Sequence, residues 1–358
     1  MAELLDFVSL SVSLSLLPRW CWRVAADWLR RGDSPNAVFR RLAAACALEE
    51  SDPALDARSR AAEAIRRAAA ASIAAISWSD AAYPVALTTI ADPPPVLWTR
   101  GRPDALSAPS VAIVGSRAAS PYGLAVAERL AADLAVSGLV VVSGLARGVD
   151  AAAHQGALSA GGLTVAVLGS GPDIIYPSEH LALAAAIDAS GAVVSELVPG
   201  TAPHHWYFPL RNRIISGLSR AVVVIEAGEK SGSLITARCA LDQGRDVLAV
   251  PGNVLTGRSR GGHALLKDGA KIVECAVDIL EELGMAPAVT VAAKAVSGRR
   301  GDPILDCLIP GEASDLDEIS EKSGLRTPRL LPRLFELELQ GLVRRIGGGR
   351  FMRVDRTC

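Results

Sequence analysis

Three short segments combine glycine, hydroxyl side chains and a cation in a way that suits phosphate binding. Each comes directly after an apolar, β-branched run: Gly115-Ser116-Arg117, Ser143-Gly144-Leu145-Ala146-Arg147-Gly148 and Gly228-Glu229-Lys230-Ser231-Gly232-Ser233. Small residues leave backbone N–H groups open to an anion, and a following helix adds the positive end of its dipole. Each segment alone is more typical of a tight turn before a capped helix. The three together predict phosphate binding by Gly115, Ser116, Arg117, Ser143, Gly144, Lys230, Ser231, Gly232 and Ser233.

None of these segments matches a nucleotide-cofactor motif. The sequence contains no GxxxxGK[ST], and Gly169-Ser170-Gly171-Pro172-Asp173-Ile174 lacks the third glycine of GxGxxG. NAD and ATP are therefore disfavoured as ligands, and no cofactor is expected.

A fourth segment interleaves aromatic rings with basic groups. It reads His204-His205-Trp206-Tyr207-Phe208-Pro209-Leu210-Arg211-Asn212-Arg213. An aromatic face stacks on any base while cations follow the backbone, so this pattern favours binding of single-stranded nucleic acid through His205, Phe208 and Arg211. The alternative is a packed corner, in which Arg211 and Arg213 pair with acids at strand ends such as Glu196, Glu226 or Asp150.

Two other groups of residues could indicate a catalytic site or a metal site. Asp150 and His154 are four residues apart on one expected helix, and Ser143 lies just upstream, which permits a Ser/His/Asp arrangement. A histidine within an alanine run is more often a core residue that is hydrogen-bonded to a neighbour. The adjacent His204 and His205 have no third ligand at a recognisable metal spacing. We therefore expect no catalytic residue and no metal.

The phosphate-binding segments require a parallel sheet to bring them together. The apolar runs VAIVG (111–115), LVVVSG (139–144), TVAVLG (164–169), AVVSE (192–196), AVVVIEAG (221–228) and DVLAVPG (246–252) alternate with helical stretches. Continuous apolar strands between helices predict an α/β fold, a Rossmann-like doubly wound and mostly parallel sheet, over residues 105–284. The loops after such strands meet at one edge of the sheet.

The regions on either side of the predicted sheet differ from it in composition and in the spacing of apolar residues. Residues 1–75 are rich in Ala, Leu and Arg at helical spacing and predict a small helical domain, and the proline-rich residues 76–104 predict an extended connector. Residues 285–300 are expected to form a linker. From residue 301 to 358, helices at 303–308, 316–323 and 327–340 followed by strands at 342–346 and 350–354 predict a winged helix.

Composition and charge narrow the function classes. The chain has 358 residues, of which half are hydrophobic and 21% charged, so a disordered chain is excluded. A net charge of −1 means that any nucleic-acid site must be a local patch. The six cysteines are scattered without zinc-site spacing, and no apolar stretch is long enough to span a membrane. Acids precede the apolar run near the N-terminus, so we expect no signal peptide and a cytoplasmic location.

The motifs resemble those of the DNA-processing protein A (DprA/Smf) family. The sequences VAIVGSRAASPYG, VVSGLARGVDAAAHQGAL, TVAVLGSGPDIIYP, FPLRNRIISGLS, EAGEKSGSLITARCALDQGRDVLAVPG and LLKDGAKIV occur in the order typical of that family. The preceding YPVALTTIADPPPVLWTRG resembles the family's entry into the Rossmann domain. An N-terminal helical, SAM-like domain and a C-terminal winged helix are similar to those of longer members.

The resemblance implies a binding protein rather than an enzyme. It implies binding of single-stranded DNA without base specificity, homodimerisation through the Rossmann domain, and delivery of the strand to RecA recombinase past single-strand-binding protein in natural transformation and recombination. Arg117 is then expected to contact phosphate and Phe208 to stack on a base. Lys230-Ser231-Gly232-Ser233 is expected to supply backbone N–H groups and a nearby cation. His205 stands where some relatives are expected to carry a phosphate-contacting lysine.

Two other function classes remain open at this point. The Rossmann-like region also resembles the nucleotide-cleaving phosphoribohydrolases of the same superfamily, which carry a PGGxGTxxE loop. The corresponding segment here, EAGEKSGSLITA, has no glutamate after its glycine-rich turn. The winged helix raises the alternative of a double-stranded DNA regulator. Residues 326–358 contain eight Arg and three acids, whereas residues 302–325 contain seven acids and one Lys, so the two halves nearly cancel.

Overall fold

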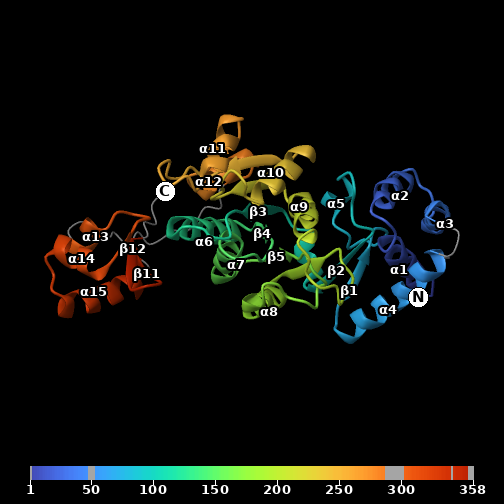
Figure 1. The fold of residues 1–358 in the computed structure, drawn as a ribbon, viewed down its shortest axis with the longest axis horizontal. Helices are drawn as coiled ribbons and strands as arrows, with labels where there is room; N and C mark the ends of the chain where they lie inside the picture. The colour runs from blue at the N-terminus through green and yellow to red at the C-terminus, as the bar shows by residue number, and fades with distance from the viewer. Residues whose placement is uncertain (1, 47–52, 287–301, 340–341, 354–358) are drawn as a thin grey trace.

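The computed structural model describes residues 2–46, 53–286, 302–339 and 342–353. In Figure 1 the N-terminal helices lie at one end of the long axis, the sheet with its helices in the middle, and the last helices and strands at the other end. The linker predicted at 285–300 lies almost wholly outside the described residues.

The N-terminal region is helical, as its spacing predicts. It contains α1 (Ala2–Ser15), α2 (Trp20–Arg30), α3 (Pro35–Ala45) and α4 (Pro53–Ala70). The Ser34 side chain caps α3 by accepting a hydrogen bond from Ala37 N, and Pro35 occupies the first turn, where its missing N–H costs nothing. A separate apolar cluster around Phe39 and Leu42 holds the first three helices together.

Residues 74–101 extend the central sheet, which corrects the prediction of a simple connector at 76–104. Strand β1 (Ala74–Ser77) pairs antiparallel with β2 (Val96–Gly101), and β2 pairs antiparallel with β6 (Ala192–Ser195). Helix α5 (Val85–Thr88) and the short helix η1 (Pro103–Leu106) flank them. The buried Val96 and Trp98 pack against Val12 of α1 and Ala64 of α4. The N-terminal helices are therefore anchored on the edge of the sheet.

The central sheet confirms the Rossmann-like, mostly parallel α/β prediction. Within the described residues, nine strands run in the order β1-β2-β6-β5-β4-β3-β7-β8-β9. Besides the three already named, these are β3 (Ser110–Val114), β4 (Val140–Ser143), β5 (Thr164–Val167), β7 (Ala221–Val224), β8 (Asp246–Ala249) and β9 (Lys271–Ile272). All six predicted strands are present. From β6 to β9 every pairing is parallel.

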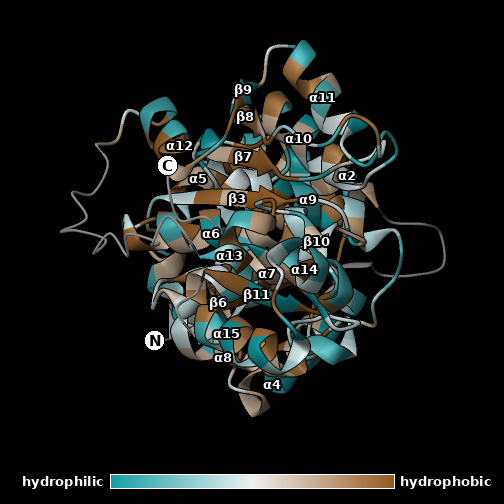
Figure 2. Ribbon diagram, turned by 90° about the vertical axis from the view of Figure 1, so that its left-hand side faces the viewer, coloured by the Kyte–Doolittle hydropathy of each residue, from teal (hydrophilic) through white to brown (hydrophobic). Residues whose placement is uncertain are grey.

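Helices cover both faces of this sheet. They are α6 (Pro121–Val136), α7 (Val149–Ser159), η2 (Ser178–His180), α8 (Leu181–Ser190), α9 (Tyr207–Leu218), α10 (Ser233–Asp242), α11 (Arg260–Lys267) and α12 (Ala276–Glu282). Alternate residues of β3 face opposite cores, because Val111 and Ile113 pack with α6 and α7 whereas Ala112 and Val114 pack with α9 and α10. Figure 2 shows the consequence as a brown band of apolar strands through the centre of the molecule.

The order of the strands changes direction between β3 and β7. From β3 the chain moves outward through β4, β5 and β6, and it then returns to place β7 on the other side of β3. In doubly wound sheets, ligands bind outside the carboxyl ends of the strands at such a point. The loop after β3 and the loop after β7 are the two that meet there.

The C-terminal region is a winged helix, as predicted. It contains α13 (Pro303–Cys307), α14 (Leu316–Ser323) and α15 (Thr327–Leu339), followed by the hairpin of β11 (Val343–Ile346) and β12 (Arg350–Arg353). The short strand β10 (Ala313–Ser314), which the sequence did not reveal, pairs with β12. Arg344 of the hairpin pairs with Glu128 of α6 through two contacts of 2.6 and 2.5 Å.

Candidate nucleic-acid interface

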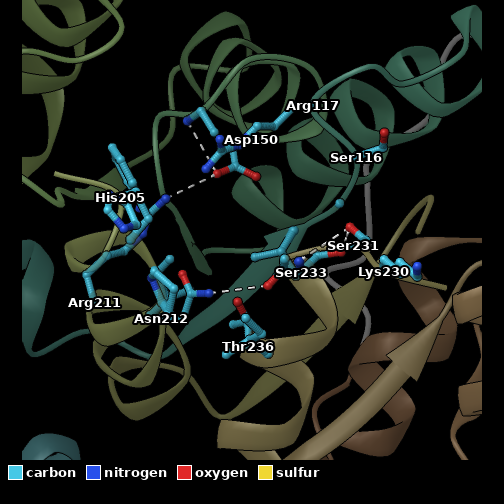
Figure 3. Close-up of a pocket in the computed structure, with 18 of the residues that line it drawn as sticks. Ser116, Arg117, Asp150, His205, Arg211, Asn212, Lys230, Ser231, Ser233 and Thr236 are labelled. Atoms are coloured by element: carbon cyan, nitrogen blue, oxygen red, sulfur yellow. Dashed lines mark hydrogen bonds and ion pairs between the residues drawn. The ribbon is translucent and has the colours of Figure 1, made fainter. Parts of the chain in front are cut away.

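A cavity of about 850 Å³ opens where the loops after β3 and β7 meet the start of α9. Ten of the twelve residues predicted as binding residues line it: Gly115, Ser116, Arg117, His205, Phe208, Arg211, Lys230, Ser231, Gly232 and Ser233. In Figure 3, His205, Arg211 and Asn212 lie on one side of this pocket, and Ser116, Lys230 and Ser231 on the other. The sheet topology therefore brings together the segments that the sequence singles out.

Ser143 and Gly144 lie behind the pocket rather than on its wall. The Ser143 hydroxyl is fully buried and donates to the carbonyl of Ile113 at 2.6 Å. Gly144 donates its N–H to Asp150, and a Cβ atom at this glycine would collide with the guanidinium of Arg211. The prediction that these two residues contact the ligand is corrected: they support the pocket from within the protein.

The loop after β3 is held tightly and leaves Arg117 exposed. Ser116 donates its N–H to the Glu226 carbonyl at 2.7 Å, and its own carbonyl accepts from Val149 N at 3.2 Å. Gly148 has φ of +75°, and a Cβ there would meet the Ser116 carbonyl, so glycine is needed for this close approach. Among the described residues, no carboxylate lies within ion-pair distance of Arg117. Its guanidinium is available to an anion.

Phe208 lies beneath that guanidinium. The Arg117 Cζ atom is 5.4 Å from the centroid of the Phe208 ring, and the Tyr176 ring is 5.5 Å from it on the same wall of the pocket. Phe208 is half-buried, and a Cβ added at Gly169 would come within 2.8 Å of its ring. A cation above a half-buried ring is an arrangement that can hold a phosphate and a base together.

Tyr176 was missed by the sequence analysis. It precedes Pro177 in the segment after β5, and 45% of its surface is exposed. The available signal was an aromatic residue at the end of a loop that follows a parallel strand, which is the edge where the other candidates lie.

Arg211 lies in the protein interior, whereas the sequence predicts that it binds nucleic acid. Only 4% of its surface is exposed, its guanidinium donates to the Val167 carbonyl, and Asp150 lies at 3.9 Å. Burial lowers the pKa of Arg211 to about 10 and raises the pKa of Asp150, even though Asp150 also accepts hydrogen bonds from Gly144 N and Ala146 N. Arg211 is therefore a structural cation of the pocket wall, as in the packed-corner alternative.

Arg213 also follows that alternative. It pairs with Glu196 and, at 3.2 Å, with Asp92, and Arg19 of the N-terminal region contacts the same two acids. Desolvation by burial lowers the pKa of Arg19. This network joins the N-terminal helices to the second half of α9, whose first turn carries Phe208.

The loop after β7 supplies the second set of anion donors. Lys230 is exposed, and Ser231 precedes the N-terminus of α10, where Gly232 is the N-cap residue and makes no side-chain cap. The Ser231 and Ser233 hydroxyls are 2.8 Å apart, and Asn212 of α9 donates to the Gly232 carbonyl at 3.3 Å. A Cβ at Gly232 would meet no atom within 4 Å, so this helix start faces open space. Hydroxyls, backbone donors and a nearby ammonium group suit phosphate.

The Ser/His/Asp arrangement is not assembled. The Ser143 hydroxyl donates a hydrogen bond to the Ile113 carbonyl, and Asp150 accepts hydrogen bonds from two backbone N–H groups. His154 Nδ1 lies 2.7 Å from the Thr164 hydroxyl. His154 is the hydrogen-bonded core histidine of the alternative interpretation. In the part of the chain that the structure describes, no cluster of three His, Cys, Asp or Glu side chains could hold a metal ion. No helix there is long and apolar enough to cross a membrane.

Comparison with known proteins gives a consistent assignment. A family model described as DNA recombination-mediator protein A matches residues 74–284, and one for the DprA winged helix domain matches residues 291–349. Protein Smf of Escherichia coli is 40% identical over 285 residues, which span 77% of this chain and 76% of that protein. DNA processing protein DprA of Streptococcus pneumoniae is 47% identical over 203 residues, 57% of this chain and 72% of that protein.

Solved structures agree with these sequence matches. DNA processing protein A of Streptococcus pneumoniae superposes with a TM-score of 0.66 at 35% identity, covering 76% of this chain and 95% of that one. A structure reported for the single-stranded DNA binding mode of DNA processing protein A from Helicobacter pylori superposes with a TM-score of 0.54 at 30% identity, covering 59% of this chain and 95% of that one. The family models, the sequence identities and the shared fold agree, and the chain belongs to the DNA recombination-mediator protein A family.

Proposed function

We propose that this protein binds single-stranded DNA without base specificity in the pocket between the loops after β3 and β7. The observation that carries the proposal is the exposed Arg117 guanidinium above the Phe208 ring, with the Lys230 to Ser233 loop lining the same pocket. The cations would hold phosphates, which every sequence offers, and the ring would stack on a base of any type. The relative from Helicobacter pylori, reported for its single-stranded DNA binding mode, supports this assignment.

The wider role rests on the family. The description of its model as a recombination mediator supports the proposal that the protein delivers the bound strand to RecA recombinase, past single-strand-binding protein, during recombination and natural transformation. We further propose a homodimer formed through the Rossmann domain, and a binding rather than an enzymatic role. The domains proposed are a helical one up to about residue 75, the Rossmann domain to 284 with the strands of 74–101 added, and the winged helix from 301.

A double-stranded DNA regulator is less well supported. On α15, Leu330, Leu334 and Leu337 are buried in the core of the winged helix. Arg333 pairs with Asp302 and Glu336 on the same domain. A recognition helix needs an exposed basic face to meet two phosphate strands, and this helix offers little of one.

The proposal is tested by binding of labelled oligonucleotides, measured by fluorescence anisotropy at fixed salt. Poly-thymidine, poly-adenosine and mixed single strands are expected to bind alike, and a duplex of the same length at least tenfold more weakly. Equal or tighter binding of the duplex would overturn the single-strand assignment. RecA loading is checked separately, by the rate of RecA filament growth on DNA coated with single-strand-binding protein in the presence and absence of this protein.

A further inference from the structure

Trp206 is a large aromatic side chain that does not line the pocket. It is the N-cap residue of α9, two positions before Phe208, and 66% of its surface is exposed. Tryptophan is usually well covered, and an exposed indole beside a binding pocket is typical of a residue that becomes covered in a complex.

The indole continues a row of rings that begins inside the pocket. His205 lines the pocket, and its ring centroid is 4.6 Å from that of Trp206 and 4.2 Å from that of His204. The interplanar angles of 39° and 38° are those of tilted neighbouring rings. Trp206 itself does not line the pocket, so His205 joins the pocket lining to an exposed indole outside it.

A single strand of several nucleotides extends beyond the pocket. A cavity of about 850 Å³ is of the size that holds a small-molecule ligand, whereas single-strand sites in proteins commonly span several nucleotides. The strand outside the pocket has unpaired bases whose apolar faces gain from stacking. The exposed indole of Trp206, next to His205 of the pocket lining, offers such a face.

We propose that Trp206 is a second base-stacking position, outside the pocket, for a nucleotide that lies beyond those held in the pocket on Phe208. This inference rests on the proposed function, because it assigns a subsite of the same strand. The ligand is an unpaired base of any type, held by its flat face. The His205 ring lies beside the indole, with 4.6 Å between the ring centroids.

The test uses the full chain and two lengths of oligothymidine. Trp206→Ala is expected to weaken binding of a strand of about 20 nucleotides by about 5- to 150-fold, the range for one stacked base. Binding of a strand of about three nucleotides, which only fills the pocket, is expected to be unchanged. Because stacking carries no charge, the fold-change for the long strand should be the same at low and high salt. Trp206→Phe should restore most of the affinity.

Oligonucleotides with one abasic position identify the base itself. Moved along the long strand, the abasic position should at one place remove the difference between the wild-type chain and Trp206→Ala. The matched control is Trp20→Ala, since Trp20 is also an exposed tryptophan, with 53% of its surface accessible, but lies on α2 away from the pocket. It should bind both strands as the wild-type chain does.

The outcomes separate this inference from the function on which it rests. If the wild-type chain fails to bind single strands, the proposed function fails. If Phe208→Ala weakens binding but Trp206→Ala binds the long strand unchanged, only the second stacking position is overturned. Equal losses for the short and the long strand would also overturn it, because Trp206 would then act within the pocket. Thermal unfolding of each variant distinguishes lost contacts from lost folding.

Discussion

Arg117 differs from the other arginines around the pocket in being exposed and having no acidic partner within ion-pair distance among the described residues. We predict that Arg117→Ala weakens binding of single strands of every sequence alike. Because one phosphate contact is lost, the slope of log affinity against log salt should fall by about 0.7 units. The measurement is a salt titration of oligonucleotide binding.

Arg102→Ala is the matched control for that experiment. Arg102 is also exposed, pairs with Asp104, and lies away from the pocket. Its variant should keep the wild-type slope. An unchanged slope in Arg117→Ala would remove Arg117 from the phosphate site.

Phe208 is predicted to contribute by stacking rather than by charge. Phe208→Ala should cost about 1–3 kcal/mol of single-strand binding, and the loss should persist at high salt while the effect of Arg117→Ala fades. Anisotropy measured at two salt concentrations checks this. If the variant instead melts at a much lower temperature, the contacts of the ring with Gly169 and Tyr176 are mainly structural.

Arg211 is predicted to act on stability. Arg211→Ala should lower the free energy of unfolding by about 3–5 kcal/mol, because it leaves the buried Asp150 carboxylate without its cation. Denaturant titration measures this loss directly. A variant as stable as the wild-type chain, with a reduced salt slope of binding, would return Arg211 to the phosphate site.

The same variant has a distinct pH dependence. Burial already raises the pKa of Asp150, and removing Arg211 removes an interaction that lowers it, so the carboxyl of the folded variant takes up a proton more readily. A raised pKa in the folded state means that stability is favoured at low pH and lost as pH rises. The destabilisation by Arg211→Ala should therefore be largest at neutral pH and shrink as the pH falls and Asp150 becomes protonated.

The candidate site shows what residue types alone can predict. Arg117 and Arg211 both follow the pattern of a cation near a turn or an aromatic residue, and the sequence could not separate them. The difference arises from tertiary structure: Arg211 lies within α9, where the Val167 carbonyl and Asp150 surround it, whereas Arg117 lies on a loop. Ser143 was misplaced for a similar reason, because it is the last residue of β4 rather than part of its loop.

At the scale of elements, α7 is joined to the sheet through a neutral histidine. The Thr164 hydroxyl donates to the Val141 carbonyl at 2.7 Å, so His154 Nδ1 must donate to Thr164. The other nitrogen, Nε2, is buried, and none of the residues that the structure describes forms a hydrogen bond with it. A second proton would have no acceptor there, and burial accordingly lowers the pKa of His154 to about 3.

This histidine is predicted to contribute to acid sensitivity. Its pKa is depressed from 6.5 to about 3 in the folded chain, so the stability linked to it is present above about pH 6.5 and is lost as the pH falls toward 3. The loss at about pH 5 is about 2 kcal/mol. The difference in unfolding free energy between the wild-type chain and His154→Gln should shift by that amount in favour of the variant between pH 7 and 5. A pH-independent difference would contradict it.

The strands show where a sequence pattern is sufficient. The strands β3 to β8 are short, continuous apolar runs because both faces of a parallel sheet are covered. This pattern is easy to identify in a sequence. The strand β1 is a short run of small and apolar residues after a helix, β2 follows three prolines, and β9 has only two residues, Lys271 and Ile272, both exposed. Their pairing depends on the sheet edge that is already present, which local sequence does not encode.

At the scale of the whole molecule, the winged helix is predicted to be dispensable for single-strand binding. Every residue that lines the pocket lies between Val114 and Thr236, and the winged helix has its own apolar core. Deleting residues 301–358 should therefore leave the affinity for single strands within about tenfold. Oligonucleotide binding by the shortened chain checks this. Tight, sequence-dependent duplex binding by residues 301–358 alone would instead support the regulator alternative.

The contact between Arg344 and Glu128 makes the placement of the winged helix against the central domain depend on the salt concentration. Both side chains are partly exposed, 42% and 26%, and such pairs contribute about 0–1 kcal/mol and weaken as salt is added. A salt titration of DNA binding therefore perturbs two equilibria at once, strand release and domain separation. The second equilibrium contributes to the salt slope of strand binding only to the extent that binding itself makes or breaks this pair, and an Arg344→Ala background removes that contribution.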